Sequence, residues 1–293
     1  MDINIPDIGT TGVVGLVIII SAIVGLVRGF VRMLIALVSL GIGCLGAYWG
    51  FLRGGSMLGG YFLNPPEWLP AVAGFAIGLG LFVISRAIFG MILEPIKVVN
   101  GRRQNHALPG GLLGLITGIV LTWFAASGIR YVGTLAEIDR LDRAITKEKI
   151  EDIPVSPLIT AKNLLDSSLP GRIHRKFDFL NDETKAQLAK LKIIAKEQYA
   201  VTKAAGTSRA VYDAFAQEDV REVLSTSPEL EMVYLREKRW SHLLESRRFR
   251  HLSRKQEVRE VLAEAAFEEA LGIAPPPLFP EGDDEDKEKT AKN

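Results

Sequence analysis

The chain opens on two apolar runs joined by a short basic turn: residues 8–27 read IGTTGVVGLVIIISAIVGLV, residues 28–32 read RGFVR, and residues 33–52 read MLIALVSLGIGCLGAYWGFL. A helix needs roughly 20 apolar residues to cross a hydrocarbon layer about 30 Å thick, and both runs reach that length. Because only five residues separate the runs, the sequence predicts a tight antiparallel hairpin of two transmembrane helices, with two arginines in its turn.

Two further apolar runs follow, at residues 69–93 and 111–129, and the charge content rises after them. Residues 1–131 hold 8 of the 35 lysines and arginines and 4 of the 34 acids. A charge at the middle of a bilayer costs about 2.5–3.5 kcal/mol on insertion scales. The charge-poor first half therefore suits a membrane, and the charge-rich second half suits water. The predicted fold class is therefore all-α: a polytopic membrane protein with about four transmembrane helices, followed by a helical soluble tail.

Three segments follow from this division. Residues 1–131 are the predicted transmembrane domain, residues 132–272 a helical extramembrane domain, and residues 273–293 a proline-rich and then charged tail that we expect to be disordered. In the extramembrane domain, helix-capping residues predict one helix over 182–204 and another that starts at the Ser253 and Gln256 capping pair and runs to Leu271.

Basic residues near the spans predict the orientation of the chain. The first turn carries two, the second loop one (Arg53) and the third loop three (Lys97, Arg102 and Arg103). The positive-inside rule places the first and third loops in the cytoplasm, so both ends of the chain are predicted to face outward, although Arg130 opposes this weakly. Asp2 and Asp7 precede the first run in place of the basic residues of a signal peptide, so that run is predicted to be retained.

Glycines recur at a spacing of four on the last span, at Gly110, Gly114 and Gly118. Small residues at this spacing share one helix face and let two helix backbones approach closely in a membrane. The ladder therefore predicts a helix-packing face, although glycine is also simply common in membrane helices.

Arg86 is the one charge well inside a predicted span. An ionisable residue in a membrane span is a functional candidate by default. The alternative is that this long side chain reaches the nearby membrane surface, where its guanidinium meets phosphate headgroups. The second interpretation is favoured because no acid lies inside a span to pair with it.

The stretch Gly25-Leu26-Val27-Arg28-Gly29-Phe30-Val31-Arg32, with an apolar helix on either side and the glycine ladder later, resembles the colicin V production protein (CvpA) family over about residues 7–131. The resemblance implies a multi-pass protein of the bacterial inner (plasma) membrane, with a role in toxin (colicin V) production or export and in envelope maintenance. It marks Arg28, Gly29, Phe30 and Arg32 as candidates for contact with the membrane interface or a partner. In two places this chain departs from the family pattern: Met33 stands where an acid is usual, and His106 and Ala107 stand where an Asp-Arg pair is usual.

Residues typical of catalytic chemistry form no motif in this sequence. The four histidines are far apart, Cys44 is the single cysteine, and no nucleotide-binding glycine loop occurs. We therefore predict no enzyme activity, no cofactor and no metal, and a non-enzymatic membrane scaffold as the function. The alternative is a small channel or transporter subunit, with Arg86 near the conduction path.

The expected partners are the lipid bilayer and either further copies of the chain or other envelope proteins. Residues 236–255 hold eight lysines and arginines with Trp240 and Phe249 between them, a pattern that could bind anionic headgroups or nucleic acid. A solvated helix face neutralised by neighbouring acids is the favoured interpretation, so nucleic acid is not expected among the partners.

Overall fold

The computed structural model describes residues 5–58, 69–92, 98–99, 102–103, 107–146, 155–178, 181–225 and 228–273. Within these residues the fold is all-α apart from one short β pairing, which confirms the predicted fold class. The chain divides into two compact units, unit 1 (Met1–Ala126) and unit 2 (Ser127–Asn293).

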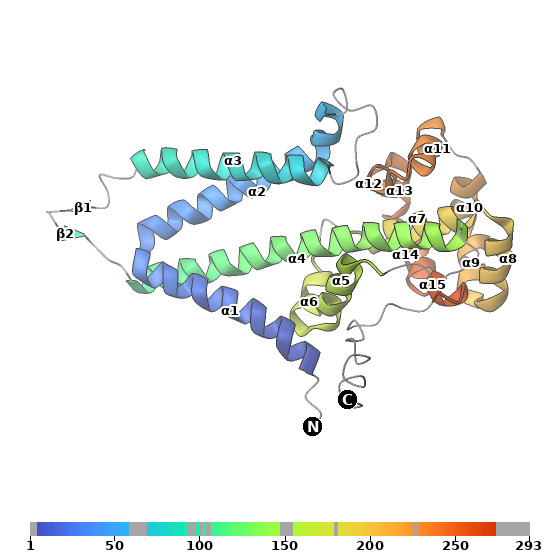
Figure 1. The fold of residues 1–293 in the computed structure, drawn as a ribbon, viewed down its shortest axis with the longest axis horizontal. Coiled ribbons are helices and arrows are strands. Elements are labelled where there is room, and N and C mark those ends of the chain that lie inside the picture. The colour runs from blue at the N-terminus through green and yellow to red at the C-terminus, as the bar shows by residue number, and fades with distance from the viewer. Residues whose placement is uncertain are drawn as a thin grey trace, which may run out of the picture. The chain divides into compact units, whose positions relative to one another are not determined.

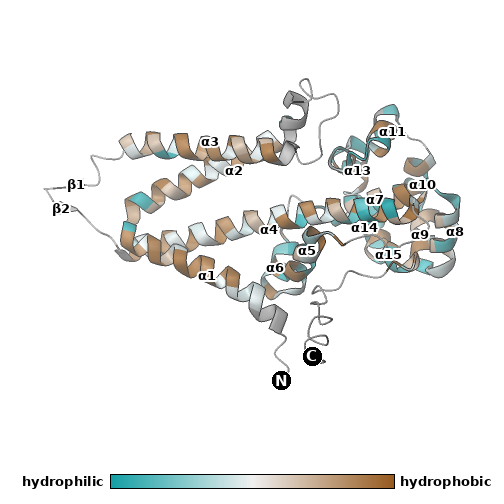
Figure 2. Cartoon of the chain, in the orientation of Figure 1, coloured by the Kyte–Doolittle hydropathy of each residue, from teal (hydrophilic) through white to brown (hydrophobic). Residues whose placement is uncertain are grey.

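Unit 1 is built from long apolar helices, coloured blue to green in Figure 1. They are α1 (Ile5–Arg28), α2 (Phe30–Leu58), α3 (Leu69–Ile92) and the first part of α4 (Ala107–Thr146), with the two-residue strands β1 (Val98–Val99) and β2 (Arg102–Arg103) paired between α3 and α4. In the described part of the chain four helices are long and apolar enough to cross a membrane, and Figure 2 shows their predominantly hydrophobic residues. The prediction of four transmembrane helices is confirmed, and the predicted end of the third span at Leu93 lies outside the described residues.

The predicted antiparallel hairpin of the first two spans is wrong in its geometry. In Figure 1, α1 and α2 diverge from a shared corner, and α2 lies along α3 instead. Glycines explain the second pairing: a Cβ atom placed on Gly74 would lie 2.7 Å from the carbonyl oxygen of Ala47, and one on Gly78 would lie 2.8 Å from that of Gly43. The α2 and α3 backbones are therefore in direct contact, as small residues allow in membrane helices.

Helix α4 runs without a break from Ala107 to Thr146, so it continues past the predicted end of the span at Ile129 into the predicted extramembrane domain. Its one proline, Pro109, lies in the first turn, where the missing N–H group costs no hydrogen bond, so nothing interrupts the helix. The predicted domain boundary after residue 131 falls inside this helix, close to the division between the units after Ala126.

Unit 2 consists of the end of α4 and a series of shorter helices. These are α5 (Pro157–Ser167), α6 (Leu169–Arg175), α7 (Glu183–Ile194), α8 (Gln198–Thr207), α9 (Arg209–Ala216), α10 (Glu218–Ser225), α11 (Glu229–Arg236), α12 (Trp240–Leu244), α13 (Arg247–Leu252), α14 (Gln256–Ala263) and α15 (Phe267–Ala270). Ile138 and Leu141 of α4 lie in the core of the unit with most of α7, together with Trp240, Phe249 and Phe267. Helix α7 is thus the central helix of the unit.

Two predicted helices of unit 2 are divided in the structure. The helix predicted over 182–204 starts correctly, with the Asp182 carboxylate accepting from the backbone N–H of Thr184, but it breaks between Ile194 and Gln198 into α7 and α8. The break lets α8 bury Ala200 and Ala204, which one straight helix would carry away from the core. The helix predicted from the Ser253 and Gln256 pair to Leu271 is likewise two helices, α14 and α15, and Ser253 instead ends α13.

Candidate functional site

The α1–α2 connection is a single residue, where the sequence predicted a five-residue turn. Gly29 has a φ angle of +77°, a conformation that only glycine adopts at little cost. Its N–H donates to the carbonyl oxygen of Gly25 at 2.9 Å, and the N–H of Met33 donates to the Gly29 oxygen at 3.2 Å. Arg28 is consequently the last residue of α1, while Phe30 and Arg32 belong to the first turn of α2.

This connection packs against the start of α4. A Cβ atom placed on Gly110 would lie 2.5 Å from the carbonyl oxygen of Gly25 and 2.8 Å from the carbonyl carbon of Gly29, and one on Gly114 would overlap the carbonyl oxygen of Ser21. Real Cβ atoms essentially never come so close, so the two backbones are in contact only because side chains are absent. We call Gly25, Gly29, Gly110 and Gly114 the glycine corner.

Gly118 continues the same contact one turn further along α4, because its Cβ position lies 2.9 Å from the Cβ of Ser21. The structure therefore brings together two sequence features that are about 80 residues apart, the Gly-Leu-Val-Arg-Gly stretch and the glycine ladder. Sequence reasoning identified both but did not predict that they face each other.

Arg28, Phe30 and Arg32 are exposed beside the glycine corner. Within the described residues no acid forms an ion pair with either arginine. The corner thus presents two guanidinium groups, which carry rigidly placed donors for carboxylate or phosphate oxygens.

Arg86 lies apart from the corner, on α3, and is also exposed. Its guanidinium carbon is 5.8 Å from the centre of the Phe82 ring, one turn earlier on the same helix. This cation–π contact offsets part of the cost of an unpaired charge in apolar surroundings.

Unit 2 contains a charged cluster that sequence reasoning missed. Arg130 of α4, considered from the sequence only as a charge that bears on orientation, is completely buried. Its guanidinium donates to Asp166 of α5 at 2.7 Å, to Asp178 after α6 at 2.8 Å and to Glu183 of α7 at 3.0 Å. We call these four residues the arginine cluster.

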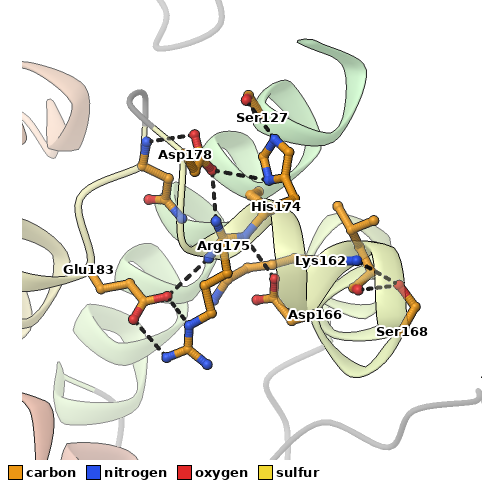
Figure 3. Close-up of polar contacts among 12 residues, drawn as sticks. Ser127, Lys162, Asp166, Ser168, His174, Arg175, Asp178 and Glu183 are labelled. Carbon is orange, nitrogen blue, oxygen red and sulfur yellow. Dashed lines mark hydrogen bonds and ion pairs between the residues drawn. The ribbon is translucent and has the colours of Figure 1, made fainter. Parts of the chain in front are cut away.

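The surroundings of the arginine cluster are also polar, as Figure 3 shows. The Nε2 atom of His174 lies 3.0 Å from the hydroxyl oxygen of Ser127 on α4. The carboxylate of Glu183 also accepts from Arg175 at 2.7 Å. Burial alone would raise the pKa of Glu183, but the hydrogen bond and charge of Arg175, helped by the charge of Arg130, outweigh burial and lower that pKa.

Further ion pairs follow along α4 toward its end. Glu137 pairs with Lys162 of α5 at 2.7 Å, and Asp142 pairs with Lys238, after α11, at 2.8 Å. Buried charges are stable only when they are paired in this way, so these contacts fix which helices lie against which turn of α4. These pairs join α4 to α5 and to a residue that follows α11.

The basic stretch at residues 236–255 is largely part of the same framework. Trp240 and Phe249, which lie between its basic residues in the sequence, are fully buried in the core of unit 2. Lys255 pairs with Asp219 at 2.6 Å, and Arg250 pairs with Glu245 at 2.9 Å. The aromatic spacing therefore reflects core packing. In the described residues no group of three or more His, Cys, Asp or Glu side chains could hold a metal ion.

Comparison with known protein families gives a match in the first part of the chain. Residues 11–146 match the family model described as "Colicin V production protein", which confirms the resemblance noted in the sequence. The match spans all four apolar helices and ends with α4, so it includes Arg130 but none of its three acidic partners. No curated protein and no solved structure matches the chain.

Proposed function

We propose that this chain, whose residues 11–146 belong to the colicin V production protein family, is a non-enzymatic scaffold of the bacterial inner membrane that acts in toxin production or export and in envelope maintenance. The observation that carries the proposal is the glycine corner. It holds Arg28 and Arg32 exposed at a rigid one-residue connection, and neither arginine has an acidic partner in the described residues.

A rigid corner with two exposed arginines suits recognition of an anionic partner. Anionic headgroups would contribute about 1 kcal/mol for each basic residue near the membrane surface, and any basic residue can supply this attraction. A carboxylate or phosphate on a partner protein would in addition use the planar fork of the guanidinium, which lysine lacks. Partner binding therefore predicts that arginine is required, whereas simple membrane anchoring does not.

The double substitution Arg28→Lys with Arg32→Lys is expected to preserve membrane insertion and orientation but to impair the envelope phenotype. The measurement is complementation of a deletion strain, with membrane abundance and topology checked in parallel. Arg53→Lys is the matched control, because Arg53 is also an exposed arginine near the end of a span but lies away from the corner. Full complementation by the double-lysine protein at normal abundance would leave the two arginines as anchors only.

The orientation is part of the proposal. The loop charges support cytoplasmic first and third loops and an extracytoplasmic C-terminal half. Alkaline phosphatase, which folds only outside the cytoplasm, is expected to be active when fused at Gly55 or Asn293 and inactive when fused at Gln104. Activity at Gln104 together with inactivity at Asn293 would reverse the orientation.

A channel or transporter subunit is the second candidate, favoured by the exposed charge of Arg86 on α3. Purified protein in liposomes separates the two functions. A scaffold is expected to give no ion flux above that of empty liposomes and to co-purify with specific envelope proteins. Flux that Arg86→Ala alters, with no such partners, would instead support the channel.

A further inference from the structure

Helix α6 has one buried and one exposed face. Gly171 and His174 are buried, whereas Leu169, Ile173 and Phe177 are exposed at 58%, 54% and 66%. These three apolar residues follow one another at a spacing of four, which places them on one side of α6 and of the turn after it. Soluble proteins bury most large side chains of this kind, so a row of three on one short helix indicates a surface that binds something apolar.

The polar residues of the same segment are all basic. Residues 169–177 read LPGRIHRKF and include no acid, and Arg172, Arg175 and Lys176 are exposed beside the apolar row. Arg175 pairs with Glu183, and Arg172 and Lys176 are exposed on the same segment. A segment with an apolar row and only basic charges complements an anionic phospholipid surface, which offers acyl chains and phosphates together.

Helix α6 lies against one particular turn of α4. His174 contacts Ser127, and Asp178 pairs with Arg130, so α6 and the residues after it are tied to the first turn of α4 in unit 2. The other pairs lie further along α4, at Glu137 and Asp142.

The apolar part of α4 ends at that same turn. Residues 108–129 of α4 contain no Asp, Glu, Lys or Arg, and Arg130 is the first charge after them. At about 1.5 Å of rise per residue, such a run is about as long as the hydrocarbon layer is thick. Ser127 and Arg130 therefore lie where the hydrocarbon ends, and the element tied to them lies at the level of the headgroups.

We propose that α6 and Phe177 form an interfacial membrane anchor, separate from the four spans. Leu169, Ile173 and Phe177 enter the boundary between headgroups and acyl chains, and Arg172 and Lys176 bind the phosphates of anionic phospholipids. The occupant is the bilayer of the same membrane, because α6 is held beside it by the buried contacts to α4. The arginine cluster thereby has a second role: it holds α6 against the turn of α4 that contains Ser127 and Arg130.

The test uses the full chain carrying Cys44→Ser, so that one introduced cysteine can be labelled with an environment-sensitive fluorophore. The labelled positions are Ile173→Cys and, as the matched control, Tyr199→Cys, an exposed residue of α8 in the same unit (78% exposed). The protein is reconstituted into vesicles of equal amounts of phosphatidylcholine and phosphatidylglycerol. The label at position 173 is expected to emit at shorter wavelength than the label at 199, and to lose fluorescence when the lipids carry a nitroxide on their acyl chains.

The outcomes separate the bilayer from other occupants. If the label at position 173 emits at the same wavelength as the label at 199, the exposed apolar face of α6 lies in water and the proposal is overturned. A short-wavelength emission without quenching by the nitroxide lipid would also overturn it, since a second copy or another protein would then cover the face. The double substitution Arg172→Gln with Lys176→Gln is expected to reduce the quenching in the anionic vesicles, and unchanged quenching would refute the headgroup contact.

Discussion

Replacing Arg130 with methionine is expected to destabilise unit 2 by about 3–5 kcal/mol, because it leaves buried carboxylates without their common cation. The side chain of Asp178 is completely buried, so it cannot recover its lost partner by turning toward water. Methionine keeps the unbranched apolar stem of arginine, so the main effect is the loss of the charge. Lysine is expected to rescue only in part, since one ammonium cannot reproduce three hydrogen bonds along a planar fork.

The measurement is hydrogen exchange of the intact protein, followed in peptides from α5, α6 and α7. Exchange in these helices is expected to accelerate strongly in the Arg130→Met protein, because each of them, or the residues that follow it, contributes an acid to the arginine cluster. The matched control is Arg209→Met, which removes an ion pair with Asp213 from an arginine that is 83% exposed. An exposed pair at this helical spacing contributes only about 0.3–0.5 kcal/mol, so the control should resemble the unchanged protein. Equal exchange in the two variants would mean that the arginine cluster does not stabilise unit 2.

Replacing Gly114 with leucine is expected to separate α1 from α4 and to lower the stability of unit 1 by about 1–3 kcal/mol or more, as overpacking of a tight contact does. Even the Cβ atom of alanine would overlap the Ser21 carbonyl oxygen, and a backbone cannot move aside as a flexible side chain can. The larger leucine adds to that overlap. The glycine corner should open as a result, which would also change the placement of Arg28 and Arg32.

Thermal unfolding in detergent measures the loss, and Gly80→Leu is the control. A Cβ atom on Gly80 of α3 meets nothing within 4 Å, so leucine there has room. Replacing glycine inside a helix stabilises the helix by roughly 0.5–1 kcal/mol where nothing clashes. Gly80→Leu should therefore raise the midpoint temperature of unfolding, and Gly114→Leu should lower it. A Gly114→Leu midpoint at or above that of the unchanged protein, with unchanged crosslinking of α1 to α4, would contradict the packing seen here.

The sequence by itself predicted the features that depend on local composition. Each membrane span can be predicted because a helix surrounded by hydrocarbon must be apolar along its whole length. That requirement appears in the sequence as an unbroken run of apolar residues. The exposed arginines beside Gly29 were identified in the same way, from the stretch that carries the family resemblance. Capping residues such as Asp182 predicted where helices start, because a cap acts within three residues of itself.

Features that join distant residues were decided only in the tertiary structure. Glycine spacing indicated that helices pack closely, but it could not say that Gly110 lies against Gly25 while Gly78 lies against Gly43, since any two small-residue faces fit each other. The break after Ile194 likewise follows from the need to bury both α7 and α8 in one core. Arg130 is the clearest case: its sequence neighbours suggest a charge at the end of a span, whereas its three acids lie 36 to 53 residues further along the chain. Ion pairs between distant residues leave no periodic pattern in a sequence, because they depend on where folding brings the partners together.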